Sequence, residues 1–200
     1  MKKNIVREGY NKAAEDYSAS RDEFANLADL EKLNSLLKPH STILDIGCGA
    51  GIPVDKFFVD HGHQVIGIDI SEKQIELAKK NVSGGEFKVK DMSELKTGEY
   101  QVDAAVSFYA IFHISRQEHQ VLFKKINSFL PHGGLILVTM GAGEYEGEEE
   151  NFHGVKMWWS HYGAEKNTEI IKTAGFEILL DEIDEGDNER HQIILARKLK

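Results

Sequence analysis

The sequence has one cysteine, Cys48, and no apolar run near the roughly 20 residues of a membrane span, so we expect no membrane association. A single cysteine cannot form an internal disulfide, which favours a reducing, cytoplasmic location. The first ten residues, MKKNIVREGY, have no apolar stretch behind their lysines, which argues against a secretory signal. Basic residues number 24 against 33 acidic ones, and the net charge is -9. Because binding to a phosphate backbone needs clustered Lys and Arg, we expect no nucleic-acid partner.

The composition suits one globular domain over residues 1–200. The chain is 41% hydrophobic, enough for a full core, and no repeat or low-complexity linker divides it. The segment 4–38 predicts two helices, which would make residues 1–38 an N-terminal helical cap. Their apolar residues recur at helical spacing: Tyr10, Ala13, Ala14 and Tyr17 in the first helix, and Phe24, Leu27, Leu30, Leu33, Leu36 and Leu37 in the second.

The stretch 42–53, TILDIGCGAGIP, gives the strongest functional signal. Residues 42–46 are β-branched and apolar, which predicts a buried parallel strand, and Pro53 suits the first turn of a helix. Three glycines lie between them: Gly47, Gly49 and Gly51. Glycine can take positive φ and lets the backbone lie against a ligand. Asp45 stands at the carboxyl end of the strand, where open α/β sheets bind ligands.

Two families use such a loop, and the glycine spacing separates them. A dinucleotide-binding loop has the form G-x-G-x-x-G and holds a pyrophosphate. Here the form is D-x-G-x-G-x-G, and a carboxylate in that place would repel a pyrophosphate but suit an ammonium group. In this respect the sequence resembles the class I S-adenosylmethionine-dependent methyltransferases. An NAD(P)-binding oxidoreductase and a binding protein that uses the cofactor without turnover remain the alternatives.

Acidic residues also end the next two predicted strands, 64–68 and 86–90. Asp45, Asp69 and Asp91 therefore follow three successive strands, as one ligand lying across the sheet edge requires. Asp69 can accept two hydrogen bonds from a ribose diol. Ile70 could pack against an adenine face or simply be buried. The resemblance implies that Asp91 contacts the adenine amino group and that the backbone of Met92 meets the ring.

The fourth predicted strand, 102–108, ends in Ser107 and Phe108. The resemblance implies that this strand tip borders the sulfonium and the acceptor. Nucleobase and glutamine methyltransferases have two prolines at this tip, and their absence here favours a small-molecule acceptor. His113 lies close by and is either a general base or a packed histidine.

The second half of the chain predicts the rest of the sheet. Ser115 and Glu118 form a capping box for a helix whose apolar face comprises Val121, Leu122, Phe123, Ile126, Phe129 and Leu130. A strand at 135–139 and a helix ending at Gly175 follow. Strands at 176–183 and 191–197, joined by a turn at 184–190, must be antiparallel. We therefore predict a doubly wound α/β fold with a mostly parallel seven-stranded sheet, helices on both faces and an antiparallel C-terminal hairpin strand.

Segment 141–162 is expected to be a long, substrate-side insertion without obvious structure. Its acidic run comprises Glu144, Glu146, Glu148, Glu149 and Glu150, and either forms a solvated loop or binds a cationic acceptor. Met157, Trp158 and Trp159 would form acceptor walls or fill the core, and His161 is a second candidate base. The resemblance implies that Tyr17 could contact the methionine part of the cofactor; the alternative is that it only seals the helix packing. We expect no metal site, and the sequence identifies neither the acceptor nor the oligomeric state.

Overall fold

The structure, a computed structural model, describes residues 2–20, 26–185 and 190–200. Phe24 and most of the predicted turn at 184–190 lie outside these residues. The first half of the chain forms α1 (Lys2–Ser20), α2 (Leu27–Leu36), β1 (Thr42–Ile46), α3 (Val54–Asp60), β2 (Gln64–Asp69), α4 (Glu72–Asn81), β3 (Glu86–Val89), η1 (Met92–Glu94) and β4 (Ala104–Ser107). The second half forms η2 (Ile111–His113), η3 (Arg116–Glu118), α5 (His119–Phe129), β5 (Leu135–Gly141), β6 (Tyr145–Phe152), β7 (Val155–His161), α6 (Ala164–Thr173), β8 (Phe176–Glu185) and β9 (Arg190–Lys198).

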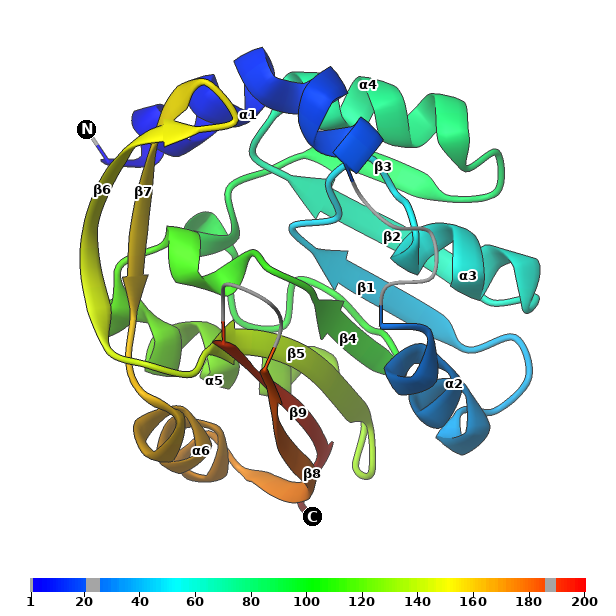
Figure 1. Cartoon of the computed structure of the whole chain (residues 1–200). Coiled ribbons are helices and arrows are strands. Elements are labelled where there is room, and N and C mark those ends of the chain that lie inside the picture. Colours follow the sequence, from blue (N-terminus) through cyan, green and yellow to red (C-terminus); the bar gives the residue numbers. More distant parts are fainter. Residues whose placement is uncertain (1, 21–25, 186–189) are drawn as a thin grey trace.

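The main sheet has the strand order β3-β2-β1-β4-β5-β9-β8 (Figure 1). Strands β1 to β5 pair in parallel, and β9 is antiparallel to both β5 and β8. The predicted α/β fold is therefore confirmed. The insertion of β9 between β5 and β8 departs from the sequential order of dinucleotide-binding sheets. The order reverses between β1 and β4, and this switch point is where open α/β sheets bind ligands.

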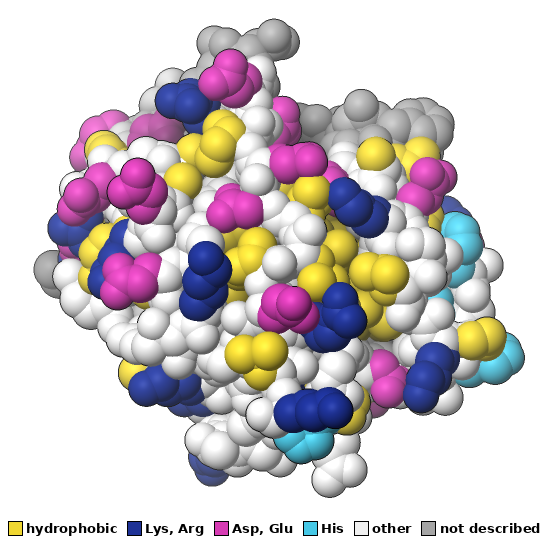
Figure 2. Space-filling view, turned by 90° about the horizontal axis from the view of Figure 1, so that it is seen from below, with side chains coloured by type: hydrophobic (Ala, Val, Ile, Leu, Met, Phe, Trp, Pro, Cys, Tyr) yellow, Lys and Arg dark blue, Asp and Glu magenta, His cyan; other side chains and the backbone are white. Residues whose placement is uncertain are grey.

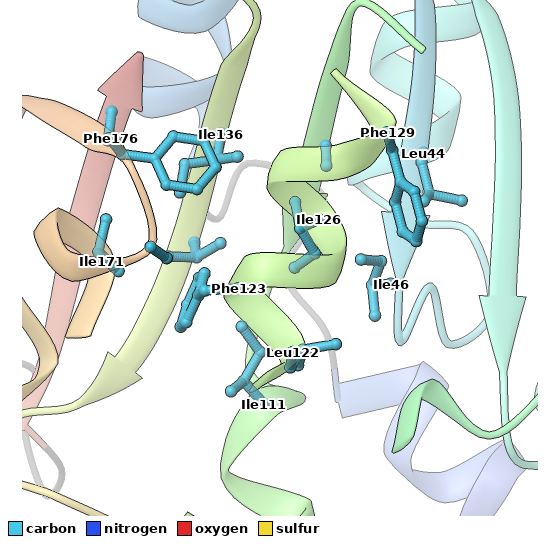
Figure 3. Packing of buried hydrophobic residues seen from close by; sticks show 14 of the residues in the cluster. Leu44, Ile46, Ile111, Leu122, Phe123, Ile126, Phe129, Ile136, Ile171 and Phe176 are labelled. Carbon is cyan, nitrogen blue, oxygen red and sulfur yellow. The ribbon is translucent and has the colours of Figure 1, made fainter. Parts of the chain in front are cut away.

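Alternate residues of the strands pack against helices on the two faces of the sheet. On one face, side chains of β1, β4 and β5 pack against α5 and α6 (Figure 3): Leu44, Ile46, Ala105, Ile136, Val138, Phe123, Ile126 and Ile171. On the other face, Ile43, Val106 and Leu137 pack against Leu30 and Leu33 of α2 and Phe58 of α3. The core thus fixes the strands that end at the glycine loop.

Segment 141–162 forms a hairpin, not the loop that we expected. Strands β6 and β7 pair antiparallel in a separate two-stranded sheet. Most of β6 is exposed, whereas Met157, Trp158 and Ser160 of β7 are buried. The hairpin extends from the end of β5, and its turn lies beside α1 (Figure 1). The N-terminal helix and the insertion therefore close over the same edge of the main sheet.

The predictions for Ser115, Val121 and Leu36, which relied on short local motifs, are wrong. Ser115 makes no side-chain capping bond, and its Oγ instead donates to Oε1 of Gln117, so α5 begins only at His119. Val121 and Leu36 were assigned to apolar faces but are exposed, at 53% and 52%. By contrast, Ser71 caps α4, because its Oγ accepts a hydrogen bond from the backbone N–H of Gln74.

Charged side chains of both signs are interspersed on the face of the molecule shown in Figure 2. Exposed ion pairs between neighbouring residues, such as Lys56 with Asp60 and Lys166 with Glu169, follow the same mixed pattern. Among the residues that the structure describes, we find no helix whose length and apolar character would let it cross a bilayer.

Candidate functional site

Two adjoining chambers lie at the carboxyl ends of β1, β2 and β4. The Asp45 chamber is lined by Asp45, Gly47, Cys48, Gly49, Ala50, Ile52, Val54, Asp69, Gln74, Phe108, Tyr109, Ala110 and His113, with Tyr10 and Tyr17 from α1. The Met92 chamber is lined by Val6, Tyr10, Gly47, Asp69, Ile70, Lys90, Met92, Ala110 and His113. Because Asp69 and Gly47 line both, the two chambers form one trough along the sheet edge.

Most of the predicted cofactor residues line this trough. Those in the Asp45 chamber are Tyr17, Asp45, Gly47, Gly49, Asp69 and Phe108; Ile70 and Met92 line the Met92 chamber. Gly51, Ser107 and Asp91 line neither chamber. The structure thus brings predicted residues from five separate segments together at the switch point. Three predicted residues lie outside the trough.

The glycine loop depends on backbone conformations that side chains rarely adopt. Gly47 has φ 84° and Gly49 has φ 54°. A Cβ at Gly47 would lie 2.2 Å from Cβ of Ala110 in the segment after β4, so only glycine allows this close approach. The N–H groups of Gly47 and Cys48 donate to the carbonyl of Ile68, which holds the loop against the end of β2.

The three residues outside the trough have structural contacts. Ser107 is fully buried, and its Oγ donates to the carbonyl of Ile46 at 2.6 Å, which joins β4 to β1. Gly51 faces α4, because a Cβ there would lie 2.9 Å from Cγ2 of Val82. Asp91 forms an ion pair of 2.9 Å with Nζ of Lys3, and its Oδ1 accepts a hydrogen bond from the N–H of Ser93. Hydrogen bonds from Lys3 and Ser93 outweigh burial and lower the pKa of Asp91.

Asp69 ties the glycine loop to the start of α4. Its Oδ2 accepts a hydrogen bond from the N–H of Gly49 at 3.0 Å, and its Oδ1 accepts one from the N–H of Ser71 at 2.8 Å. Burial raises the pKa of this carboxyl to about 6, although the backbone hydrogen bonds act in the opposite direction. The backbone N–H of Ile70 also stabilises the ionised form, and because a carboxylate can accept about four hydrogen bonds, it can still accept one from a ligand hydroxyl.

Asp45 lies next to a second buried acid that the sequence did not reveal. Asp45 is 2% exposed and Asp55 of α3 is fully buried. Burial, followed by the negative charge of Asp45 and a hydrogen bond to it, raises the pKa of Asp55 well above its ordinary value. Burial and the neighbouring carboxylate therefore favour the protonated form of Asp55.

His113 is a packed histidine with a partner on each ring nitrogen. Its Nδ1 lies 2.9 Å from the carbonyl oxygen of Trp158 and must donate, so Nε2 of the neutral ring accepts from the hydroxyl of Tyr10 at 2.8 Å. Burial lowers the pKa of His113 to about 4, which keeps the ring neutral at pH 7. Tyr10 was not expected at the site, because its helical spacing indicates only packing.

A third chamber, of about 390 Å³, lies between the hairpin and the ends of β5 and β9. This hairpin chamber is lined by Phe112, Gly141, Tyr145, Glu148, Glu149, Trp159, His161, Arg190 and His191. Aromatic contacts form the wall toward the Asp45 chamber: the His113 and Trp159 rings are 4.4 Å apart, and the Tyr109 and His191 rings are 4.9 Å apart. The two candidate bases, His113 and His161, therefore lie in different chambers.

His161 is held in one tautomer. Its Nδ1 donates to the carbonyl of Gly143 at 2.6 Å, so the lone pair of the neutral ring is on Nε2. The ring packs directly on Gly141, where a Cβ would lie 2.2 Å from Nδ1. Trp159 lines the same chamber, and its indole Nε1–H is buried with no hydrogen-bond acceptor among the described residues. The hairpin chamber thus offers a ligand an acceptor on His161, whereas the indole N–H of Trp159 is buried in the chamber wall.

Helix α1 and the hairpin pack on each other above the trough. Val6 and Tyr10 of α1 form a buried cluster with Met157 and Trp158 of β7. Around the cluster, exposed ion pairs join α1 to the hairpin and to α4, between Lys2 and Glu146 and between Arg7 and Glu72. Within the described ranges, no three His, Cys, Asp or Glu side chains are grouped so as to hold a metal ion.

Comparison with known proteins agrees with this architecture. A family model described as a methyltransferase domain matches residues 43–134. Phosphoethanolamine N-methyltransferase 3 of Arabidopsis thaliana is 27% identical over 187 residues, which cover 88% of this chain and 35% of that protein. Phosphoethanolamine N-methyltransferase 1 of Zea mays is 30% identical over 159 residues, which cover 76% of this chain and 31% of the relative. The chain thus spans about a third of the length of these relatives.

Two solved structures share the fold over nearly the whole chain. The magnesium protoporphyrin IX methyltransferase from Synechocystis, with bound S-adenosylhomocysteine, has a TM-score of 0.75 at 17% identity and covers 99% of this chain and 100% of its own. The 1,6-didemethyltoxoflavin-N1-methyltransferase of Burkholderia thailandensis has a TM-score of 0.76 at 18% identity, with 98% and 88% covered. At these identities the likeness shows the fold.

Proposed function

The chain belongs to the class I S-adenosylmethionine-dependent methyltransferases by its fold and its methyltransferase domain, and from this premise we propose that it methylates a small-molecule acceptor. The observation that supports this proposal most directly is the arrangement of chambers. A trough with buried acids lies beside an aromatic chamber, and the ring pairs His113 with Trp159 and Tyr109 with His191 lie between the two. We propose that the two chambers hold two small ligands, which come into contact when these rings move apart.

The residues of the trough fit the cofactor. When bound, S-adenosylmethionine supplies a methyl group activated on a sulfonium. We propose that Asp45 and the glycine loop hold its amino-acid end, because a buried carboxylate suits an ammonium group. Asp69 would accept the ribose hydroxyls, and Ile70 and Met92 would pack against the adenine. Tyr17 and Phe108 would border the sulfur, since both line the Asp45 chamber. Ser107, Gly51 and Asp91 would support these groups from behind.

Helix α1 must move for the cofactor to enter. The Asp45 and Met92 chambers have volumes of about 60 and 40 Å³, whereas small-molecule sites enclose roughly 300 Å³ or more. Tyr10 and Tyr17 cover the trough, so an outward movement of α1 would open it. Because the ion pairs of α1 with Glu146 and Glu72 are exposed, solvent screens them and they hold the helix only weakly. After closure, the tyrosines would exclude water from the reacting centre.

Tyr10 and His113 are the pair that we propose to accept a proton from the acceptor. A ligand N–H or O–H that reaches the phenolic oxygen of Tyr10 can give its proton to that oxygen, while the Tyr10 proton passes to Nε2 of His113. Nε2 can take this proton because Nδ1 already donates to the carbonyl of Trp158. His161 lines the hairpin chamber and not the trough, so we propose that it orients the part of the acceptor that remains in the hairpin chamber, through its Nε2 lone pair. We also propose the cytoplasm as the compartment, because the one cysteine is buried and reduced.

The first test is titration calorimetry of the purified protein with S-adenosylmethionine, S-adenosylhomocysteine and NADH. We expect both sulfur compounds to bind at or below about 100 μM, and NADH not to bind. Release of S-adenosylhomocysteine during incubation with a panel of small amines, phenols and carboxylic acids would then identify the acceptor. Cofactor binding without turnover on any class of acceptor would favour a binding protein, and binding of NADH alone would overturn the proposal.

A further inference from the structure

Gln74, the third residue of α4, has a buried amide with no partner in the described part of the chain. The side chain is 1% exposed, and it lines the Asp45 chamber. Its backbone N–H donates to Oγ of Ser71, but neither Nε2 nor Oε1 has a hydrogen-bond partner among the described residues. The capping box at Ser71 is thus made on one side only, because Gln74 does not reach back to the cap.

An unsatisfied buried amide destabilises a folded protein. Transfer of an amide from water to an apolar environment is unfavourable unless a hydrogen bond replaces the lost water, and most buried side-chain polar atoms in native structures have a partner. Leucine has nearly the same size as glutamine and would fill this position of α4 without that cost. The amide therefore has a role that the isolated chain does not show, and its place in the chamber wall indicates a ligand.

The position of Gln74 in the trough indicates which end of the cofactor its amide would contact. Asp69 lines both chambers and marks the middle of the trough. Ile70 and Met92 line only the Met92 chamber, whereas Gln74 and Asp45 line only the Asp45 chamber. Gln74 is thus on the side opposite to the apolar, adenine-accepting end. A Cβ at Gly49 would lie 3.8 Å from Oε1 of Gln74, so the amide is directly beside the glycine loop.

We propose that Gln74 determines specificity for the amino-acid end of the cofactor, with its Nε2 donating a hydrogen bond to the ligand carboxylate. This inference rests on the proposed cofactor site. An α-amino acid group has a cationic and an anionic part, and Asp45 suits only the ammonium group. The carboxylate must approach a region that already contains the negative charge of Asp45. A neutral amide donor there satisfies the carboxylate without adding a charge that would pair with Asp45 instead.

Gln192 provides a matched control. It is also 1% exposed, but its amide is fully used, since Nε2 donates to Oγ1 of Thr168 and Oδ1 of Asp181, and Oε1 accepts from Nδ2 of Asn167. It lines none of the three chambers. Gln192→Leu should lower the melting temperature by several degrees, because its partners lose their hydrogen bonds. Gln74→Leu should leave the melting temperature of the ligand-free protein unchanged or higher.

The test measures binding of S-adenosylhomocysteine and of 5′-methylthioadenosine, which lacks the amino-acid group, by calorimetry. We expect Gln74→Leu to weaken S-adenosylhomocysteine binding about 10- to 100-fold and to leave 5′-methylthioadenosine binding within about twofold. Gln192→Leu should change neither affinity in its folded state. Three results would overturn this inference and leave the proposed cofactor site in place. They are equal weakening of both compounds by Gln74→Leu, an unchanged affinity of Gln74→Leu for S-adenosylhomocysteine, or a loss of stability like that of Gln192→Leu. Wild-type protein that binds neither compound would overturn the proposed function as well.

Discussion

The hydroxyl of Tyr10 lies 2.8 Å from Nε2 of His113, which joins the N-terminal helix to the tip of the fourth strand across 103 residues of sequence. The other ring nitrogen of His113 lies 2.9 Å from the carbonyl oxygen of Trp158 in the hairpin. One imidazole therefore connects α1, the switch point and the inserted hairpin. This connection makes the cap and the insertion parts of one enclosure around the site.

Replacement of Tyr10 by phenylalanine tests this connection. The change leaves Nε2 of the buried His113 without its donor, so we expect the free energy of unfolding to fall by about 1–3 kcal/mol. If the pair accepts a proton during methyl transfer, kcat should fall at least tenfold while the affinity for S-adenosylhomocysteine stays within about threefold. Thermal unfolding and a methyl-transfer assay measure the two effects. Tyr100→Phe is the control, because Tyr100 packs against Phe129 away from the trough. Unchanged kcat in Tyr10→Phe would remove the pair from the proposed chemistry.

The sequence predicted the parts of the site that depend on local pattern. Asp45, Asp69 and Met92 could be placed because parallel strands end at one edge of a sheet, and a glycine loop after the first strand marks the switch point. Gln74 and Asp55 could not be placed at the site, because both lie in helices and not at the end of a strand. Only the packing of α3 and α4 against the loop buries their polar groups.

Strand β6 of the hairpin could not be predicted from its own sequence. Strand β6, YEGEEENF, has little intrinsic β-propensity and resembles a solvated acidic loop. It is a strand because it pairs with β7, whose Met157 and Trp158 are buried against α1. This pairing depends on residues about 150 positions earlier in the chain, which no local window includes.

The affinity for cofactor should depend on pH through Asp69. Burial raises the pKa of this carboxyl from 3.8 to about 6. Ribose hydroxyls donate to the ionised form, so binding of S-adenosylhomocysteine should weaken as the pH falls below about 6, by up to about tenfold per pH unit. Calorimetry at pH 5, 6, 7 and 8 measures this dependence. Asp69→Asn does not titrate and should bind weakly at every pH; a wild-type affinity that stays constant from pH 5 to 8 would contradict the assignment.

The Asp69 carboxyl should also make the stability of the ligand-free protein depend on pH. Stability should be higher at low pH, whereas the affinity for cofactor should be higher at high pH. The folded-state pKa of this carboxyl lies above the unfolded value, so its stabilising contribution is fully present below about pH 4 and is lost as the pH rises through about 6. A shift of about two pKa units corresponds to at most ~3 kcal/mol. Relative to Asp69→Asn, ligand-free wild-type protein should therefore lose stability between pH 4 and 7, as urea unfolding can measure. A difference that does not vary with pH would show that Asp69 has an ordinary pKa.

Ser107→Ala separates a structural serine from a cofactor contact. Ser107 was expected at the cofactor, but its buried hydroxyl donates to the carbonyl of Ile46. We therefore expect the substitution to lower the free energy of unfolding by about 1 kcal/mol and to leave the affinity for S-adenosylhomocysteine within about twofold. Phe108→Ala, at the next position and in the chamber wall, should weaken binding as well as stability. A tenfold loss of affinity in folded Ser107→Ala would restore the original assignment.

Gly47 and Gly98 form a pair that separates backbone strain from close packing. Both have positive φ, 84° and 70°. A Cβ at Gly98 would meet nothing within 4 Å, so Gly98→Ala should cost only the left-handed backbone penalty of about 1–2 kcal/mol. At Gly47 the same Cβ would also overlap Ala110, which lies behind the loop and lines both chambers of the trough.

Gly47→Ala should therefore lower the unfolding free energy more than Gly98→Ala does, and should abolish measurable binding of S-adenosylhomocysteine even where the protein remains folded. Circular dichroism and calorimetry on the two variants measure fold and affinity separately. Gly98→Ala should bind like wild type. If Gly47→Ala folds and binds normally, the loop can shift away from Ala110, and the proposed contact between the glycine loop and the cofactor loses its structural basis.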